Sequence, residues 1–152
     1  MTRIDTEWVE KATTELHASG RRAGGARAEV ITQLSRETCA VTAEQLERTL
    51  ADENRRVGRA SIYRALEALA HVGLVQRVDL GETGSRWERI GANGHDHHHH
   101  LLCSACGQLV PFEDQRLETA LQHLAANKEF TVDSHEVTLH GRCASCAAKQ
   151  AA

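Results

Sequence analysis

Four of the five cysteines stand in two short pairs, C-S-A-C at 103–106 and C-A-S-C at 143–146. Each pair can present two thiolates to one tetrahedral ion at about 2.3 Å, the usual geometry of structural zinc. Chance spacing is one alternative; thioredoxin-like redox chemistry is another, but it needs one pair near a βαβ pattern, which the sequence lacks. The spacing therefore favours a structural zinc site with the ligands Cys103, Cys106, Cys143 and Cys146. The remaining thiol, Cys39, is expected to be a small core residue.

Histidine gives the second chemical signal, because ten are present and five of them crowd residues 95–100. If this segment is extended, its side chains alternate, so His98 and His100 face one side while His97 and His99 face the other. One strand could then serve two separate metal sites. Imidazole suits zinc, iron and nickel and binds in its neutral form, so occupancy should fall below about pH 6.5. A solvated polar linker is the alternative, but the run adjoins the first cysteine pair.

Charged residues are distributed unevenly along the chain. Residues 1–90 carry 14 Lys+Arg against 14 Asp+Glu, and residues 91–152 carry 4 against 7, so the net charge of −3 arises in the second part. Four arginines and no acidic residue occupy 55–64, and a second basic cluster contains Arg21, Arg22 and Arg27. Such clusters can bind a polyanion such as nucleic acid. The alternative is that the charged residues only form a solvent-exposed surface.

The first part of the sequence has the pattern of four helices and a hairpin. Apolar residues recur at helical spacing, T-A-E-Q at 42–45 is a capping box, and G-E-T-G separates two β-rich runs. The expected elements are helices from Asp5 or Thr6 to about Gly20, over 26–36, from Thr42 to about 52–54 and up to Gly73, with strands over 74–80 and 85–90. This order, with arginines before and inside the last helix, predicts a winged helix-turn-helix DNA-binding domain over residues 1–90.

The last of these helices would enter the major groove of DNA. Arg59, Ala60, Tyr63 and Arg64 face away from its apolar stripe, which leaves two cationic donors and one aromatic hydroxyl on the exposed face. We expect Arg59, Tyr63 and Arg64 to contact bases and phosphates. The alternative is a helical domain with incidental surface arginines.

Residues 97–152 are predicted to form a small α/β dimerisation domain after a hinge loop at 91–96. The expected elements are a strand over 108–112, a helix over 113–127 with Leu117, Leu121 and Leu124 inward, and strands in F-T-V (130–132) and H-E-V-T-L-H (135–140). Zinc would fasten the terminal cysteine pair to the first strand. Because the unit is small and has few aromatic residues, we expect it to need both its metal and a partner subunit, giving a homodimer. The fold class of the whole chain is therefore α+β.

Three stretches of the chain resemble the ferric uptake regulator family of metal-dependent bacterial repressors. They are R-A-S-I-Y-R-A-L, H-H-H-H-L-L-C-S-A-C-G and L-H-G-R-C-A-S-C, and the resemblance extends from about Ser19 to Cys146. It implies that the paired cysteines hold the structural zinc. It also implies that Tyr63 and Arg64 contact DNA and that Arg22 reaches the minor groove.

The same resemblance implies two further metal sites. One lies in the dimerisation domain, with the ligands His97, His99, Glu118 and His135. The other is a regulatory site that bridges the two domains, with the ligands His98 and His100 and, from the wing, Glu88 and Asp79. Alternative ligands for the regulatory site are His95, Asp96 and Cys39. We expect Zn(II) or Fe(II) there, because mixed imidazole and carboxylate ligands accept several divalent metals.

Ligands from two domains can share one ion only at a fixed interdomain angle, so the metal would hold a flexible pair of DNA-binding heads in one arrangement. We therefore expect a metal-dependent transcriptional repressor of metal-uptake genes, a homodimer that binds a palindromic operator in double-stranded DNA. A metal-storage protein or metallochaperone is the alternative, but neither needs the arginine-bearing helix or the hairpin.

The sequence does not predict an enzyme. A zinc hydrolase or deaminase would need two histidines four apart with an adjoining glutamate, or H-x-E with a later P-C-x-x-C, and neither frame occurs. The start, M-T-R-I-D-T-E-W, is too polar for a signal-peptide core, and no apolar run approaches the about 20 residues that span a bilayer. We therefore expect a cytoplasmic protein with no membrane partner.

Overall fold

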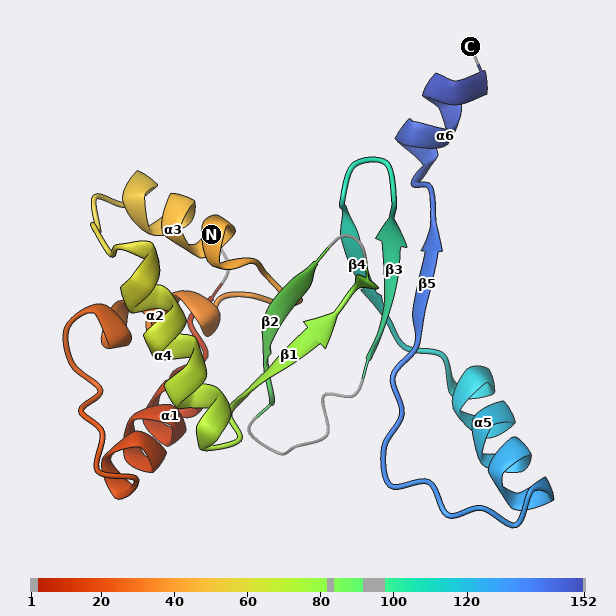
Figure 1. The fold of residues 1–152 in the computed structure, drawn as a ribbon, viewed down its shortest axis with the longest axis horizontal. Helices are drawn as coiled ribbons and strands as arrows, with labels where there is room; N and C mark the ends of the chain where they lie inside the picture. Colours follow the sequence, from red (N-terminus) through yellow and green to blue (C-terminus); the bar gives the residue numbers. More distant parts are fainter. Residues whose placement is uncertain (1–2, 82–83, 92–97, 152) are drawn as a thin grey trace. The chain divides into compact units, whose positions relative to one another are not determined.

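The computed structural model describes residues 3–81, 84–91 and 98–151 (Figure 1). The chain forms two compact units, Met1–Asp96 and His97–Ala152. Of the expected hinge loop at 91–96, only Gly91 lies within the described residues. In the described ranges, no helix has both the length and the apolar character that crossing a bilayer requires.

The first unit contains four helices followed by an antiparallel hairpin. The elements are α1 (Thr6–Ala18), α2 (Ala26–Leu34), α3 (Ala43–Asp52), α4 (Arg59–His71), β1 (Val75–Asp79) and β2 (Ser85–Arg89). An isolated antiparallel bridge between Val41 and Trp87 joins the segment before α3 to β2. This order confirms the predicted winged helix-turn-helix, in which the hairpin of β1 and β2 is the wing.

The core of the first unit is aliphatic, with a single tryptophan. Residues spaced three and four apart on each helix point inward, because the α-helix repeats every 3.6 residues. The fully buried large side chains of the four helices are Trp8, Leu16, Ile31, Leu34, Leu46, Leu50, Ile62, Leu66 and Leu69. α4 contacts α1, α2, α3 and β1, so its inner face is fixed in the core. Its other face remains outside, where Tyr63 is 39% exposed.

Two helices of the first unit have side-chain caps at their starts, and the one at α3 is the predicted capping box. The Trp8 N–H donates to Asp5 Oδ1 at 3.1 Å, which caps α1. At α3, the Gln45 N–H donates to Thr42 Oγ1 at 3.0 Å, and the Thr42 N–H donates to Gln45 Oε1 at 2.7 Å. These bonds satisfy N–H groups that have no partner inside the helix. The helix starts are therefore set by the local sequence.

Replacing Asp5 with alanine is expected to lower the free energy of unfolding by about 1 kcal/mol at neutral pH, because the cap of α1 is lost. The Trp8 N–H, and secondarily Arg89 (Nη1 to Asp5 Oδ2, 2.6 Å), hold the pKa of Asp5 below its ordinary value despite partial burial. A carboxyl with a depressed folded-state pKa adds stability above its unfolded pKa and loses it as the pH falls through the folded value. Urea unfolding should therefore show the difference between wild type and Asp5→Ala shrinking in acid; a constant difference would contradict this assignment.

The second unit is built on a three-stranded sheet. Its elements are β3 (His99–Cys103), β4 (Leu109–Phe112), α5 (Gln115–Asn127), β5 (Thr138–Gly141) and α6 (Ala144–Ala151). The strand order is β4-β3-β5, with β3 antiparallel to β4 and parallel to β5. Parallel neighbours need a crossover connection, which α5 and residues 128–137 provide. The central strand, β3, therefore carries its histidines and Cys103 between the other two.

The second unit differs from the expected elements in three places. Residues 130–132 form no strand, α6 is not predicted by the sequence pattern, and Leu124 is 56% exposed instead of inward. Glu129 has a φ of 52° and reverses the chain at the end of α5. Phe130 is then 70% exposed. The strand prediction was wrong because apolar residues in a short run can equally lie on a surface that has no sheet neighbour.

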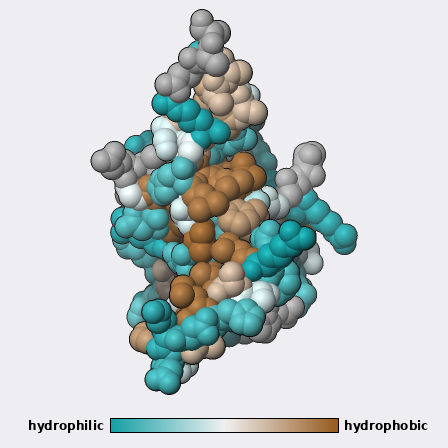
Figure 2. Space-filling view, turned by 90° about the vertical axis from the view of Figure 1, so that its right-hand side faces the viewer, coloured by the Kyte–Doolittle hydropathy of each residue, from teal (hydrophilic) through white to brown (hydrophobic). Residues whose placement is uncertain are grey.

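The second unit has little core of its own. Among its described residues, only Leu102 and Cys103 are buried apolar residues. Large apolar side chains instead lie 39–70% exposed, and Figure 2 shows a continuous apolar stripe on the face that carries β5 and α5. The exposed apolar residues of this unit are Leu101, Val110, Leu124, Phe130, Val132 and Leu139. Monomeric proteins rarely expose such a contiguous surface.

Candidate metal centres and nucleic-acid interface

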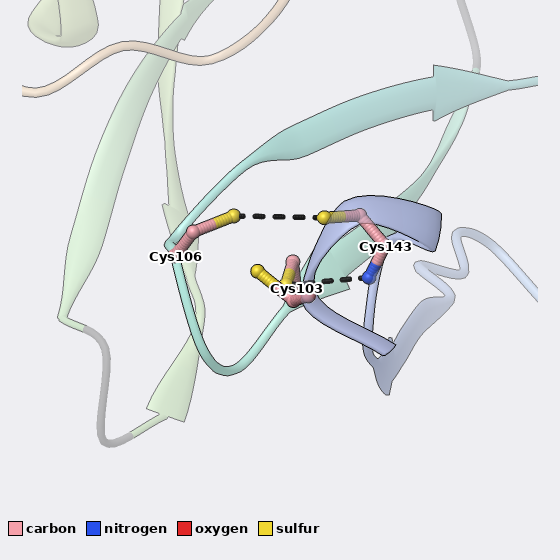
Figure 3. A group of neighbouring side chains, drawn as sticks. Cys103, Cys106 and Cys143 are labelled. Carbon is pink, nitrogen blue, oxygen red and sulfur yellow. Dashed lines mark hydrogen bonds between the residues drawn. The ribbon is translucent and has the colours of Figure 1, made fainter. Parts of the chain in front are cut away.

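The four paired cysteines meet at one end of the sheet in the second unit. Cys103 ends β3 and Cys106 lies in the turn that follows, while Cys143 and Cys146 lie just before and within the first turn of α6. One sulfur from each lies within 4.8 Å of the others. In Figure 3 the sulfurs of Cys106 and Cys143 face each other at 3.8 Å. The structure thus brings together the four thiols that the sequence spacing singles out.

The separation of the sulfurs fits a zinc ion. Four ligands at about 2.3 Å from a tetrahedral centre are about 3.8 Å from one another, and Cys106 Sγ and Cys143 Sγ are 3.8 Å apart. A disulfide would need a separation of about 2.05 Å, and all four thiols are free. Four protein sulfurs complete a tetrahedral shell without an open position, which is typical of a structural zinc site and not of a catalytic one.

Backbone N–H groups favour the thiolate form of Cys103, whereas neighbouring thiols oppose the thiolate form of Cys146. The Cys143 N–H donates to Cys103 Sγ at 3.3 Å and, with the N–H groups of Cys106 and Ala105, lowers the pKa of Cys103 to about 6. The thiols of Cys143 and then Cys106 raise the pKa of Cys146 to about 12. A bound divalent cation would favour the thiolate form of all four cysteines, because metal binding deprotonates coordinating thiols.

A second cluster lies at the opposite end of β3. His99 Nε2 is 2.7 Å from Glu118 Oε1, and His135 Nε2 is 3.1 Å from Glu118 Oε2. The two imidazole rings have centroids 5.3 Å apart, and His99 is 1% exposed. Glu118 comes from the first turn of α5, so the cluster joins the strand, the helix and the segment before β5. Two imidazoles and a carboxylate are ligands that zinc accepts.

The expected regulatory ligands form one pair in each unit. In the first unit, Cys39 Sγ and a Glu88 carboxylate oxygen lie within 4.8 Å of each other, and Gln76 Nε2 donates to Glu88 Oε2 at 3.3 Å. Cys39 is half-buried and free, not the core residue that the sequence suggested. In the second unit, the rings of His98 and His100 meet edge to face with centroids 4.9 Å apart. Three expected ligands lie outside the described residues: His95, Asp96 and His97.

Asp79 and Glu88 do not lie next to each other in the wing. The register of the wing pairs Asp79 with Ser85 and Glu88 with Gln76, so the two carboxylates point to opposite faces. They also stand three residue pairs apart along the ladder, about 10 Å at 3.3 Å per residue. The Asp79 carboxylate instead accepts a hydrogen bond from the Gly81 N–H at 3.0 Å. The two carboxylates cannot bind one ion in this register.

The outer face of α4 carries the expected DNA-reading side chains. Tyr63 and Arg64 are exposed, and Arg64 Nη2 donates to Ser61 Oγ at 2.9 Å. Arg59 lies one turn before Tyr63 on the same face, since helical side chains four apart are neighbours. The first turn of α4 contains no acidic residue, and the free N–H groups of a helix start carry partial positive charge. This face suits a polyanion.

Two expected DNA contacts have partners within the first unit. Arg22 is exposed before α2, and its carbonyl accepts a hydrogen bond from the Arg27 guanidinium. Arg59 donates from Nε and Nη2 to Oε2 of Glu47 at 2.9 and 2.6 Å, and Glu47 raises the pKa of Arg59 further above its ordinary value. Sequence reasoning missed Glu47, because only the packing of α3 on α4 brings it to Arg59.

Residues 18–140 match the model of the ferric uptake regulator family. The chain belongs to the ferric uptake regulator family. It is 27% identical over 143 residues to the ferric uptake regulation protein of Bacillus subtilis, covering 93% of this chain and 96% of that protein. It is 33% identical over 106 residues to the ferric uptake regulation protein of Bordetella parapertussis, covering 70% of this chain and 74% of that protein.

Solved structures of the family agree with this assignment. The ferric uptake regulator of Vibrio cholerae superposes with a TM-score of 0.76 at 27% identity, covering 86% of this chain and 98% of that one. The Helicobacter pylori ferric uptake regulator, described as having three functional metal-binding sites, has a TM-score of 0.81 at 21% identity with 97% of both chains covered, and supports the fold. This member of the ferric uptake regulator family is therefore a DNA-binding transcription regulator with metal sites.

Proposed function

We propose that this family member is a metal-dependent repressor of metal-uptake genes and binds a palindromic operator in double-stranded DNA as a homodimer. The main support for the proposal is that the candidate DNA-binding face and two of the candidate metal sites lie in different units. The first presents the exposed face of α4 in a winged helix-turn-helix, and the second holds the cysteine cluster and the cluster around Glu118. A metal-storage protein or metallochaperone would use only the clusters.

The homodimer is supported by the surface of the second unit. A groove of about 700 Å³ beside α5 is lined mainly by apolar side chains. Its apolar lining residues are Leu121, Leu124, Ala125, Ala126, Phe130 and Val132. A second copy of the chain would cover this surface through twofold symmetry, so that each subunit supplies the core that the other lacks.

Zinc is the ion we assign to the four-cysteine cluster, where it would fasten the start of α6 to the turn after β3. The binding free energy of structural zinc, about 10–16 kcal/mol in small zinc domains, acts as folding free energy. That contribution is large for a unit with so few buried apolar residues. The cluster of His99, Glu118 and His135, with His97 as a fourth ligand, would fasten α5 to β3 in the same way.

The regulatory ion, Zn(II) or Fe(II), is proposed to take Cys39 and Glu88 from the first unit and His98 and His100 from the second. An ion that needs ligands from both units restricts their relative orientation only while it is bound. The two half-sites of a palindrome must be contacted together, so the restricted state would favour DNA. Shifting an equilibrium from 1:99 to 99:1 needs about 5.5 kcal/mol of differential affinity, less than the about 10–16 kcal/mol of tight zinc binding.

Glu88→Gln should weaken regulatory metal binding by at least about tenfold and reduce metal-dependent DNA binding accordingly, because even indirect support of a metal ligand is worth about 10–100-fold. Asp79→Asn is the matched control, since it removes the same charge from the opposite face of the wing. Zinc titration against a competing chelator measures the first effect, and a gel shift the second. The opposite pattern, with Asp79→Asn impaired and Glu88→Gln normal, would transfer the ligand role to Asp79.

A gel shift tests the proposed function. Zinc-loaded full-length protein would first select duplexes from a random-sequence pool. The best duplex would then be titrated with and without a chelator mild enough to leave the cysteine-bound zinc in place. We expect a palindromic sequence whose retardation is lost on chelation and restored by zinc or iron(II). If no sequence is enriched although zinc is bound, the chain stores or carries metal and the proposal fails.

A further inference from the structure

Arg89, the last residue of β2, joins three segments of the first unit. Its Nε donates to the Glu37 carbonyl at 3.2 Å, and its Nη1 donates to Asp5 Oδ2 at 2.6 Å. Glu37 follows α2, where its N–H donates to Leu34 O at 3.0 Å, and Asp5 is the N-cap of α1. The Arg89 side chain is 21% exposed, so most of it lies inside these contacts. It therefore fixes the end of α2 and the start of α1 against the end of β2.

The segment that Arg89 attaches to β2 carries Cys39. On the other side of Cys39, the N–H groups of Val41 and Trp87 each donate to the other's carbonyl, at 2.8 and 2.7 Å, which attaches the segment to β2 a second time. Between these two attachments, residues 38–40 make no backbone hydrogen bond within the described part of the chain. The position of Cys39 therefore depends on the attachments that flank it.

These attachments place the Cys39 thiol beside the Glu88 carboxylate. Cys39 Sγ and a Glu88 oxygen lie within 4.8 Å of each other. A tetrahedral zinc ion, with its thiolate at about 2.3 Å and its carboxylate at about 2.1 Å, would hold the two atoms about 3.6 Å apart. Glu88 is fixed from the neighbouring strand by Gln76, whose Nε2 donates to Oε2 at 3.3 Å. A displacement of the Cys39 segment by about 1 Å is enough to weaken such a site.

We propose that Arg89 is a positioning residue for the regulatory metal site: it keeps the Cys39 thiol within ligand distance of Glu88. This inference rests on the proposed function, in which both of these side chains bind the regulatory ion. Asp5, which orients the guanidinium, lies before residues 18–140, the part of the chain that matches the family model. Family membership therefore does not predict this contact. In this role Arg89 acts through Cys39 and binds neither the ion nor DNA.

Arg89→Gln tests the proposal with cobalt(II) as the probe. Full-length protein that keeps zinc at the four-cysteine cluster would be titrated with cobalt(II), and the thiolate-to-cobalt charge-transfer absorption recorded. Cobalt(II) at the cluster around Glu118 does not contribute, because that cluster contains no thiol. We expect the variant to require about tenfold more cobalt(II), as for loss of an outer partner of a metal ligand, and to show a weaker absorption at saturation. Losing a positive charge would by itself favour a cation, so this weakening reports position and not charge.

Two comparisons show whether the effect depends on Cys39. Arg77→Gln removes the same charge from the wing, where Arg77 Nε donates to Ser85 Oγ at 2.7 Å; it should not weaken cobalt(II) binding. In a Cys39→Ser background, Arg89→Gln should change the cobalt(II) concentration for half-maximal DNA binding less than about twofold, because the double-mutant cycle then lacks the side chain that is positioned. A gel shift with the selected duplex measures that concentration.

Arg89→Lys keeps the test decisive if Arg89→Gln unfolds the first unit. A lysine keeps the positive charge and can pair with Asp5, but its single ammonium cannot reproduce the fork of donors that also reaches Glu37. We expect a thermal midpoint close to that of wild type together with the same loss of thiolate absorption. A residue that only stabilises the fold would show the reverse, with a lower thermal midpoint and unchanged cobalt(II) binding.

The outcomes distinguish this inference from the proposed function. If wild type shows the thiolate absorption and the Arg89 variants show it undiminished, Arg89 does not position Cys39, while the metal-dependent regulator stands. The role of Arg89 is also refuted if Arg89→Gln weakens metal-dependent DNA binding as much without the Cys39 thiol as with it. If wild type gives no thiolate absorption, or binds DNA regardless of metal, the proposed function fails and this inference fails with it.

Discussion

Replacing Tyr63 and Arg64 together with alanine should weaken operator binding by about 100-fold or more, because each good side-chain contact with a base is worth about 1–3 kcal/mol. Both residues lie on the exposed face of α4 and neither belongs to the core. The fold and the metal clusters should therefore survive the change. Fluorescence anisotropy with the selected duplex measures the affinity, and metal analysis of the same sample measures the zinc content.

His71→Ala is a suitable control for this double variant. His71 is the last residue of α4 and is exposed, so its truncation changes the same helix at the end away from Arg59. It should bind the selected duplex within about twofold of wild type, as expected for a surface change that removes no base contact. Loss of zinc from the Tyr63/Arg64 variant, or undiminished DNA binding, would contradict the separation of reading and metal-binding residues between the two units.

Cys103→Ser should remove the tightly held zinc and lower the stability of the second unit, with loss of the dimer. Cys103 is 4% exposed and accepts the Cys143 N–H, so it lies at the centre of the cluster. Removing one of four thiolates forfeits much of the about 10–16 kcal/mol that a structural zinc site contributes to folding. The first unit has a core of its own, so we expect two thermal transitions, of which only the one from the second unit moves.

Cys39→Ser is the matched control, because it changes a free thiol outside the four-cysteine cluster. It should keep the tightly held zinc and the dimer, and alter only the weaker regulatory metal binding. Metal analysis after dialysis, calorimetry and sedimentation measure the three properties. A Cys103→Ser protein that remains dimeric with an unchanged thermal transition would show that zinc is not what stabilises the second unit.

The parts predictable from the sequence are those with local signals. The capping box of Thr42 and Gln45 fixes the start of α3 within four residues of chain, and the apolar spacing of α4 determines which face is exposed. The four zinc thiols come from two C-x-x-C pairs, whose short spacing already restricts their geometry. The two pairs come together at one end of the sheet because β3 and β5 are neighbouring parallel strands.

The parts that could not be predicted depend on contacts between distant segments. Glu47 reaches Arg59 through helix packing. Cys39, which the sequence analysis names only as one of three alternative ligands, lies near Glu88 because the segment before α3 bridges to β2. No periodicity encodes either pair. Phe130 lies in a short apolar segment whose pattern predicts a strand. In the structure it is exposed, on the surface that we propose a second subunit covers. An apolar residue covered by another chain has the same pattern as one covered by its own.

The most direct test of metal-dependent DNA binding is to measure zinc affinity at the regulatory ligands with and without the selected duplex, keeping the cysteine-bound zinc in place. If the ion and the operator favour the same state, each must raise the affinity of the other by the same factor. We expect this factor to be about 100 in both titrations, within the range of allosteric coupling. Equal zinc affinity in the presence and absence of the duplex would contradict a metal-controlled repressor.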